Sequence, residues 1–154
     1  MARPSTRTLG ILRDKPLTAK DGTPESPLHE AAWAGDIDTV KRLVESGANV
    51  NWKDSIGETP LFGAAAWGRV DVVRYLLSVG AACNLQESGG WTPLHYAASH
   101  GDLETIKILI EAGADPKAKD QEGRLPIDLA HQYGKGAHVK YLKTVGPEIA
   151  SRRQ

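Results

Sequence analysis

The chain has 154 residues, of which 40% are hydrophobic and 25% charged, and its formal net charge is zero. This composition is typical of one soluble globular domain. The charges are unevenly distributed, because residues 1–20 carry five basic and one acidic side chain whereas residues 21–146 carry 12 basic and 17 acidic ones. An acidic body argues against nucleic-acid binding, which needs a basic face, and mildly favours a basic or amphipathic partner.

Cysteine usage and apolar runs indicate the compartment. Cys83 is the one cysteine, so no intrachain disulfide can form, and this fits the reducing cytoplasm, or the nucleus of a eukaryote. The sequence contains no run of 18 apolar residues, so we expect no membrane insertion. The N-terminal sequence MARPSTRTLGILR contains Arg, Ser and Thr but no acid, as mitochondrial transit peptides do. Mitochondrial targeting is a minor alternative to a solvated basic tail.

Three residue series recur with a period of 33. They are Pro27, Pro60, Pro93 and Pro126, then Gly35, Gly68, Gly101 and Gly134, then Gly47, Gly80, Gly113 and Gly146. A fixed period of this length is the signature of stacked repeats. We expect repeats at about 21–53, 54–86, 87–119 and 120–146, followed by a tail, 147–154. Residues 1–20 lack the period, and we expect them to form a flexible basic extension.

Each repeat predicts two short helices. A Ser or Thr before the proline can cap the first helix, and the glycine of the second series is expected to end it with a left-handed turn. Apolar residues at i, i+3, i+6 and i+7 then form one face of a second helix, as at Val70, Val73, Leu76 and Leu77. The glycine of the third series ends this helix. A polar stretch suited to a projecting β-type turn leads into the next repeat.

The motifs Thr-Pro-Leu-His-Tyr-Ala at 92–97 and Gly-Ala-Asn-Val-Asn at 47–51 resemble those of the ankyrin family. The resemblance covers residues 21–146. It implies an all-α solenoid of stacked helix–turn–helix units with projecting β-hairpin turns, which binds other proteins. The last repeat departs from the pattern at Leu125, Asp128 and Gly136, as expected of a terminal capping repeat with one face in water.

The sequence shows no pattern of catalysis. It lacks a Gly-rich phosphate loop, H-E-x-x-H and G-x-S-x-G, so we expect no enzyme, cofactor or metal. His29 and His95 occupy the family's histidine position, where the side chain hydrogen-bonds turn backbone. His100 lies at the exposed end of a first helix, where a binding role and a merely solvated one are about equally favoured. Cys83 is expected to be a small buried hydrophobe.

The resemblance also suggests a modification. Ankyrin proteins can be hydroxylated on the hairpin asparagine by a 2-oxoglutarate dioxygenase, and Asn51 and Asn84 match that position. The alternative, which we prefer, is that these asparagines hydrogen-bond the turn.

The resemblance places the partner on the concave face, which first helices and hairpin tips line. Positions that vary between repeats are the expected contacts: Trp33, Lys53, Ile56, Glu58, Trp67, Ser88, Trp91, Ser99, His100, Gln121, Arg124 and Tyr133. Tryptophan and tyrosine dominate interface hot spots. We therefore expect Trp33, Trp67 and Trp91 to form a solvent-accessible stripe, and we favour binding over the alternative that they pack against neighbouring helices.

The function predicted from the sequence is a monomeric, non-enzymatic adaptor or regulator that grips a partner protein or peptide. The alternative is a targeting or docking protein whose residues 1–20 carry the activity, with Leu9, Ile11 and Leu12 as apolar contacts, while the repeats hold a cargo. A third hypothesis, an enzyme with an unrecognised site on the concave face, is the least favoured.

Overall fold

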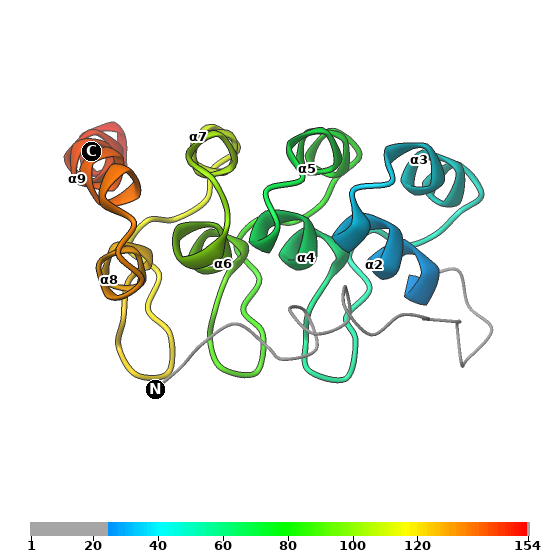
Figure 1. Cartoon of the computed structure of the whole chain (residues 1–154), viewed down its shortest axis with the longest axis horizontal. Helices are drawn as coiled ribbons and strands as arrows, with labels where there is room; N and C mark the ends of the chain where they lie inside the picture. The colour runs from blue at the N-terminus through cyan, green and yellow to red at the C-terminus, as the bar shows by residue number, and fades with distance from the viewer. Residues whose placement is uncertain (1–24, 154) are drawn as a thin grey trace.

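The computed structural model describes the backbone of residues 25–153 and the side chains of residues 27–145. This part of the chain forms helices in two parallel rows, with loops that project from the first row (Figure 1). The first helices are α2 (Glu25–Ala34), α4 (Pro60–Ala66), α6 (Pro93–His100) and α8 (Pro126–Gln132), and the second helices are α3 (Ile37–Glu45), α5 (Val70–Ser78), α7 (Leu103–Glu111) and α9 (Gly136–Arg153). The expected extension, residues 1–20, lies outside the described residues.

Three of the four first helices begin at the proline of the repeat, and a threonine precedes that proline in two of them. Helices α4, α6 and α8 begin at their prolines, which lose no needed donor at that position. Thr92 caps α6 by accepting a hydrogen bond from the His95 amide at 3.3 Å, whereas Thr59 makes no such bond. The expectation that Ser26 caps α2 is wrong, because α2 begins at Glu25 and already includes Ser26.

Small residues set the distance between the first helices. Each first helix packs against the next one along the stack. Alanines fill these contacts and are almost fully buried: Ala31, Ala32, Ala64, Ala65, Ala97, Ala98 and Ala130. The second helices bury one apolar face against the first row, where Val40, Val73 and Ile106 have no exposed surface. No repeat can bury its own apolar face, so the core is continuous along the stack.

The glycines between the helices serve two different purposes. Gly80 has φ +100°, a left-handed conformation that ends α5 and that a β-branched residue tolerates poorly. Gly101 was expected to be left-handed too, and this is wrong, since its φ is −85°. A Cβ at residue 101 would overlap the carbonyl oxygen of Ala65. Gly101 is therefore required for the close approach of α6 to α4 rather than for a turn.

The projecting loops are closed by a carboxylate rather than by strands. In each, one carboxylate accepts the backbone N–H groups two and four residues ahead: Asp54 from Ile56 and Glu58, Glu87 from Gly89 and Trp91, and Asp120 from Glu122 and Arg124. Backbone bonds also join neighbouring loops, from the Ser88 amide to the Ile56 carbonyl and from the Gln121 amide to the Gly89 carbonyl. We call these loops, residues 52–58, 85–91 and 118–124, the hairpins.

Trp33 is a core residue, and its predicted exposure is wrong. Only 1% of its surface is exposed. Its indole lies where the side chain of residue 63 would be, and residue 63 is glycine, so that a Cβ there would overlap Trp33 Cδ1. The corresponding residues of the next two repeats, Ala66 and Ser99, are also 1% exposed. This position is buried wherever a following repeat covers it.

Substitutions at Trp33 and Gly63 should therefore be coupled. Trp33→Ala is expected to destabilise the fold by about 3–5 kcal/mol through a cavity, and Gly63→Ala by about 1–3 kcal/mol through overpacking. The double variant should cost less than the sum, because the new methyl group enters the vacated space. Denaturant unfolding measures the free energy of unfolding of all three variants. Gly136→Ala, where the added Cβ meets no atom within 4 Å, is the control, and additive costs would contradict the packing described.

Candidate functional site

We use the term concave face for the surface formed by the first helices and the hairpins. The residue just before the glycine that follows a first helix is partly exposed on this face in three successive repeats: Trp67, His100 and Tyr133. The rings of His100 and Tyr133 meet edge to face, with centroids 4.7 Å apart. We call these three residues the aromatic strip. It runs across α4, α6 and α8 and spans three of the four repeats.

The aromatic strip lies on a second hydrophobic cluster, separate from the core between the helix rows. Trp67 and Tyr133 pack against it, and its buried members are Phe62, Ala66, Trp91, Tyr96 and Leu129. Trp67 is therefore half-buried, and part of its surface stays accessible to solvent, as predicted. Contacts with this cluster hold the indole of Trp67 in place, as is typical of interface anchors.

The predicted exposure of Trp91 is also wrong. Trp91 is 1% exposed, and its Nε1 donates a hydrogen bond to Asp120 Oδ2 of the next hairpin at 3.0 Å. Its ring stacks on His95, with centroids 6.1 Å apart, and meets Tyr96 edge to face. Trp91 thus joins the second and third hairpins.

Glu58 and Ser99 were predicted at the surface, and both are buried. Glu58 has no exposed surface, and the Tyr96 hydroxyl lies 2.5 Å from its Oε2 and 3.2 Å from Glu87 Oε2. Ser99 is 1% exposed and donates its hydroxyl to the His95 carbonyl at 3.0 Å. The Tyr96 hydroxyl of α6 thus contacts carboxylates from the first and the second hairpin.

The hairpin tips keep most of their predicted exposure. Lys53, Ser88 and Gln121 are exposed, and Ile56 and Arg124 are half-buried. Two of them also have structural roles. Gln121 Nε2 donates to the Ser88 carbonyl at 2.6 Å, which joins adjacent tips, and Arg124 Nε lies 3.0 Å from Asp120 Oδ2.

A signal in the sequence could have identified the buried tryptophan. Gly63 stands where the other repeats have Glu30, Tyr96 and Leu129, so the second repeat lacks a side chain that its neighbours possess. A large residue one repeat earlier fills the missing volume. The small residues Ala66 and Ser99 at the positions equivalent to Trp33 also indicate a crowded site.

The family histidines bind turn backbone, as the resemblance implied. His29 Nε2 donates to the Glu58 carbonyl at 2.7 Å, and His95 Nε2 to the Arg124 carbonyl at 3.0 Å. His95 Nδ1 accepts the Thr92 amide at 3.1 Å, so His95 must be neutral with its proton on Nε2. Burial lowers the pKa of His95 most, although hydrogen bonding to Arg124 opposes it.

The asparagines at the predicted modification positions join successive repeats. Asn51 Nδ2 donates to the Gly80 carbonyl at 3.0 Å, and Asn51 Oδ1 accepts the Ala82 amide at 2.8 Å. Asn84 makes the same pair of bonds to Gly113 and Asp115. These bonds agree with the turn role that we preferred, and hydroxylation of either residue stays a prediction.

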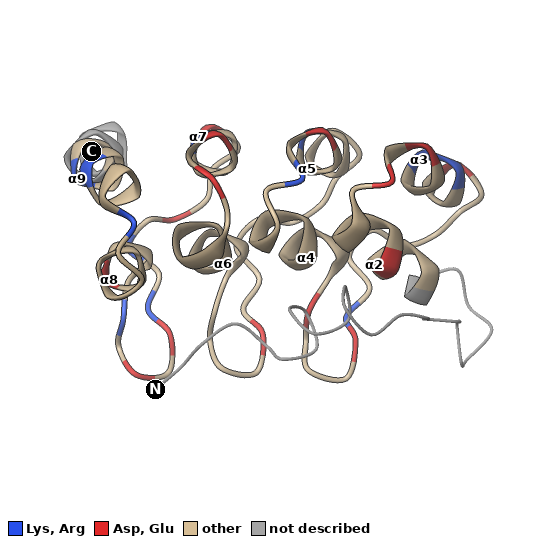
Figure 2. Ribbon diagram, in the orientation of Figure 1, with Lys and Arg blue, Asp and Glu red and all other residues tan. Residues whose placement is uncertain are grey.

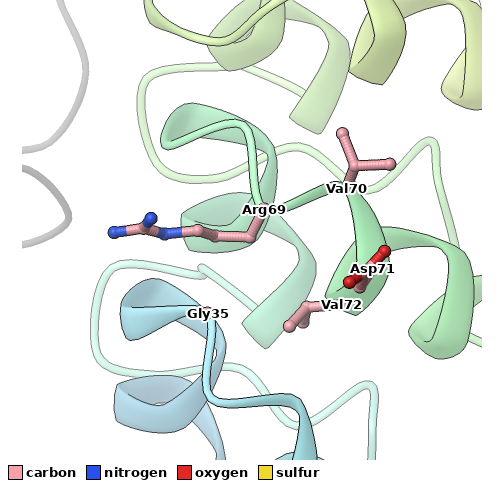
Figure 3. A pocket seen from close by; sticks show the side chains of 5 residues that line it. All are labelled: Gly35, Arg69, Val70, Asp71 and Val72. Atoms are coloured by element: carbon pink, nitrogen blue, oxygen red, sulfur yellow. The ribbon is translucent and has the colours of Figure 1, made fainter.

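The described residues offer few side chains that could bind or transform a small molecule. A hollow of about 240 Å³ lies between Gly35 and the start of α5 (Figure 3). Its side chains are one Arg, one Asp and two Val, and Arg69 Nε donates to the Trp33 carbonyl at 2.9 Å. Among the described residues, no three His, Cys, Asp or Glu side chains gather as metal ligands would. Cys83 is half-buried, and burial raises the pKa of its thiol.

Comparison with known proteins agrees with this geometry. The family model for ankyrin repeats (many copies) matches three overlapping stretches, residues 28–77, 61–110 and 94–143. The chain belongs to the ankyrin-repeat family, whose members are generally protein-protein interaction modules and typically not enzymes. No curated protein matches the chain. Within residues 25–153, no helix is long and apolar enough to span a bilayer.

Two histidines with a lowered pKa predict a loss of stability in mild acid. Burial lowers the pKa of both His95 and His100, and Lys135 adds to the effect at His100. Below pH of about 6.5 the unfolded chain binds protons that the folded chain does not. The free energy of unfolding should therefore decrease as pH falls from 6.5 towards 5. Denaturant unfolding of the wild type and of His95→Gln/His100→Gln should show a smaller decrease in the variant. Exposed His131→Gln is the control and should follow the wild type.

Proposed function

We propose that this protein is an adaptor or regulator that binds a basic or amphipathic segment of a partner protein on its concave face. The observation that carries the proposal is the aromatic strip of Trp67, His100 and Tyr133, which is partly exposed across three repeats while the surrounding framework is buried and hydrogen-bonded. Lys53 and Ser88, at the hairpin tips, are exposed as well. Binding is the activity in this proposal, and it needs no catalytic group.

Charge at the centre of this face supports a basic or amphipathic partner. Helices α4 and α6 carry no Lys, Arg, Asp or Glu, whereas charged residues lie on α2, on α8 and on the hairpins (Figure 2). The first two hairpins contain Asp54, Glu58 and Glu87 against one basic residue, Lys53. Glu58 is buried, so a partner would meet the half-buried Asp54 and Glu87. An apolar strip with these two carboxylates on the same face suits a segment that carries both apolar and cationic side chains.

Rigidity of the strip supports binding rather than incidental exposure. Trp67 rests on the second hydrophobic cluster, and the His100 ring contacts Tyr133 and lies 2.8 Å from the Ser99 hydroxyl through Nδ1. A side chain that is already held in place loses little conformational entropy when it binds. The arrangement is thus suited to rigid presentation.

Trp67→Ala should weaken partner binding by about 2 kcal/mol or more, which is roughly 30-fold. The variant should also lose about 1–2 kcal/mol of stability, because Trp67 is half-buried. Proteins captured by the wild type would be identified first, and the affinity of each purified partner would then be titrated at a temperature where both variants are folded.

Tyr75→Ala provides the matched control. Tyr75 is a half-buried aromatic residue of the same repeat, but it lies on α5 in the opposite row. A partner lost equally by both variants would indicate general destabilisation, and a partner retained by Trp67→Ala would refute binding at the aromatic strip.

A further inference from the structure

We propose that Phe62 is a positioning residue of the concave face: it occupies the place of the family's histidine in the second repeat and provides the apolar support by which Trp67 is held. The inference rests on the proposed function, because it concerns a residue that we expect a partner to contact. Phe62 has no exposed surface, so it acts through its neighbours and does not touch the partner.

The histidine at this position joins one repeat to the next hairpin. His29 Nε2 and His95 Nε2 donate to backbone carbonyls 29 residues further along the chain, at 2.7 and 3.0 Å. In the third repeat the histidine also contacts the threonine before the helix, since His95 Nδ1 lies 2.9 Å from Thr92 Oγ1. A histidine here therefore satisfies a buried hydroxyl and a carbonyl of the following repeat.

The second repeat keeps both of these polar groups but lacks the histidine. Thr59 corresponds to Thr92, and its hydroxyl is buried without a hydrogen-bond partner. The Trp91 carbonyl, 29 residues after Phe62, accepts the Glu87 amide at 2.9 Å, and among the described residues no side chain donates to it. An unsatisfied buried hydroxyl destabilises a fold. Sequences that specify a fold break such local rules mainly at functional sites.

The Phe62 ring packs into the second hydrophobic cluster instead. It meets the Tyr96 ring edge to face, with centroids 5.7 Å apart, and Tyr96 meets Trp91 in the same way at 5.1 Å. The Tyr96 hydroxyl contacts carboxylates of the first two hairpins. Trp67 and Tyr133 pack against this cluster. Aromatic contacts thus extend from Phe62 to the cluster that supports two of the three residues of the aromatic strip.

An imidazole at position 62 would not provide the same support. The two histidine rings of the first and third repeats each contact a tryptophan of a hairpin, with centroids 5.4 and 6.1 Å apart. The Phe62 ring contacts Tyr96 of the following first helix. A histidine at residue 62 is therefore expected to bind the hairpin and to leave Tyr96, and with it Trp67, less firmly held.

Fluorine NMR of the full chain labelled with 5-fluorotryptophan tests the positioning without a partner. The chain has four tryptophans, and Trp67→Phe assigns the signal of Trp67. In Phe62→His the Trp67 signal should broaden or divide, since an indole that exchanges between positions on the μs–ms timescale gives such a signal. The signal of Trp33, which packs against Gly63, should stay as in the wild type.

Phe62→Leu is the matched control, because leucine keeps an apolar side chain at this position but cannot donate to the hairpin. Its Trp67 signal should remain single. An unchanged Trp67 signal in Phe62→His, or equal broadening in Phe62→Leu and Phe62→His, would overturn the proposal. Failure of Phe62→His to fold would overturn it as well, because two other repeats accommodate a histidine here.

The urea midpoint of unfolding shows whether the introduced histidine binds the groups that Phe62 leaves unsatisfied. At pH 8, where the histidine is neutral, Thr59→Val should lower the midpoint in the Phe62→His background, because it removes a partner of the histidine. In the wild-type background Thr59→Val should leave the midpoint unchanged or raise it, since the hydroxyl has no partner there. A decrease of equal size in both backgrounds would contradict the proposal.

Titration of a partner identified with the wild type adds the functional measurement. Phe62→His is expected to weaken binding about tenfold or more, and Phe62→Leu about threefold or less. If Trp67→Ala loses the partner and Phe62→His retains it, the proposal is overturned. If Trp67→Ala retains the partner, the proposed function is refuted, and the fluorine signal still decides the role of Phe62. The two failures are therefore distinguishable.

Discussion

The stack depends on polar side chains that reach the backbone of the next repeat, 29 residues further along the chain. His29 and His95 bind the Glu58 and Arg124 carbonyls, and Asn51 binds the Gly80 carbonyl with the same offset. Each bond joins a hairpin or a helix end that would otherwise present an unsatisfied carbonyl at a crowded interface. The constant offset is possible only if every repeat has the same shape. The 33-residue period is thus the consequence of a repeated hydrogen-bond geometry.

This constraint divides the chain into framework and surface. Asp54, Glu87 and Asp120 close the hairpins by accepting two backbone amides each, so the carboxylates belong to the framework even where they lie near the concave face. Burial and hydrogen bonds to Arg124 and Glu122 act in opposite directions on Asp120, and the net effect lowers its pKa. Positions without a framework role remain for recognition. The aromatic strip occupies such positions, one in each of three repeats.

The buried aromatic residues show how neighbouring repeats adapt to each other. Trp33 fills the volume that Gly63 leaves empty, and Trp91 donates its indole N–H to Asp120 of the following hairpin. Each pair is a contact between two adjacent repeats, as expected in a solenoid whose stability is the sum of repeat and interface contributions. The large aromatic residues therefore divide between two roles. Those that meet a neighbouring repeat stabilise the stack, and Trp67 and Tyr133 remain partly available to a partner.

The sequence by itself determined the repeat architecture, the three proline-initiated helices and the backbone-binding role of His29 and His95, because these depend on residues that recur every 33 positions. It also predicted Trp67, His100 and Tyr133 at the partly exposed position. It did not determine the burial of Trp33, Glu58, Trp91 and Ser99 or the extended backbone of Gly101. Those were decided by contacts with the following repeat, such as the missing side chain at Gly63 and the Ala65 carbonyl against Gly101. A periodic pattern specifies which face a position lies on, whereas the volume left by a neighbour specifies whether water reaches it.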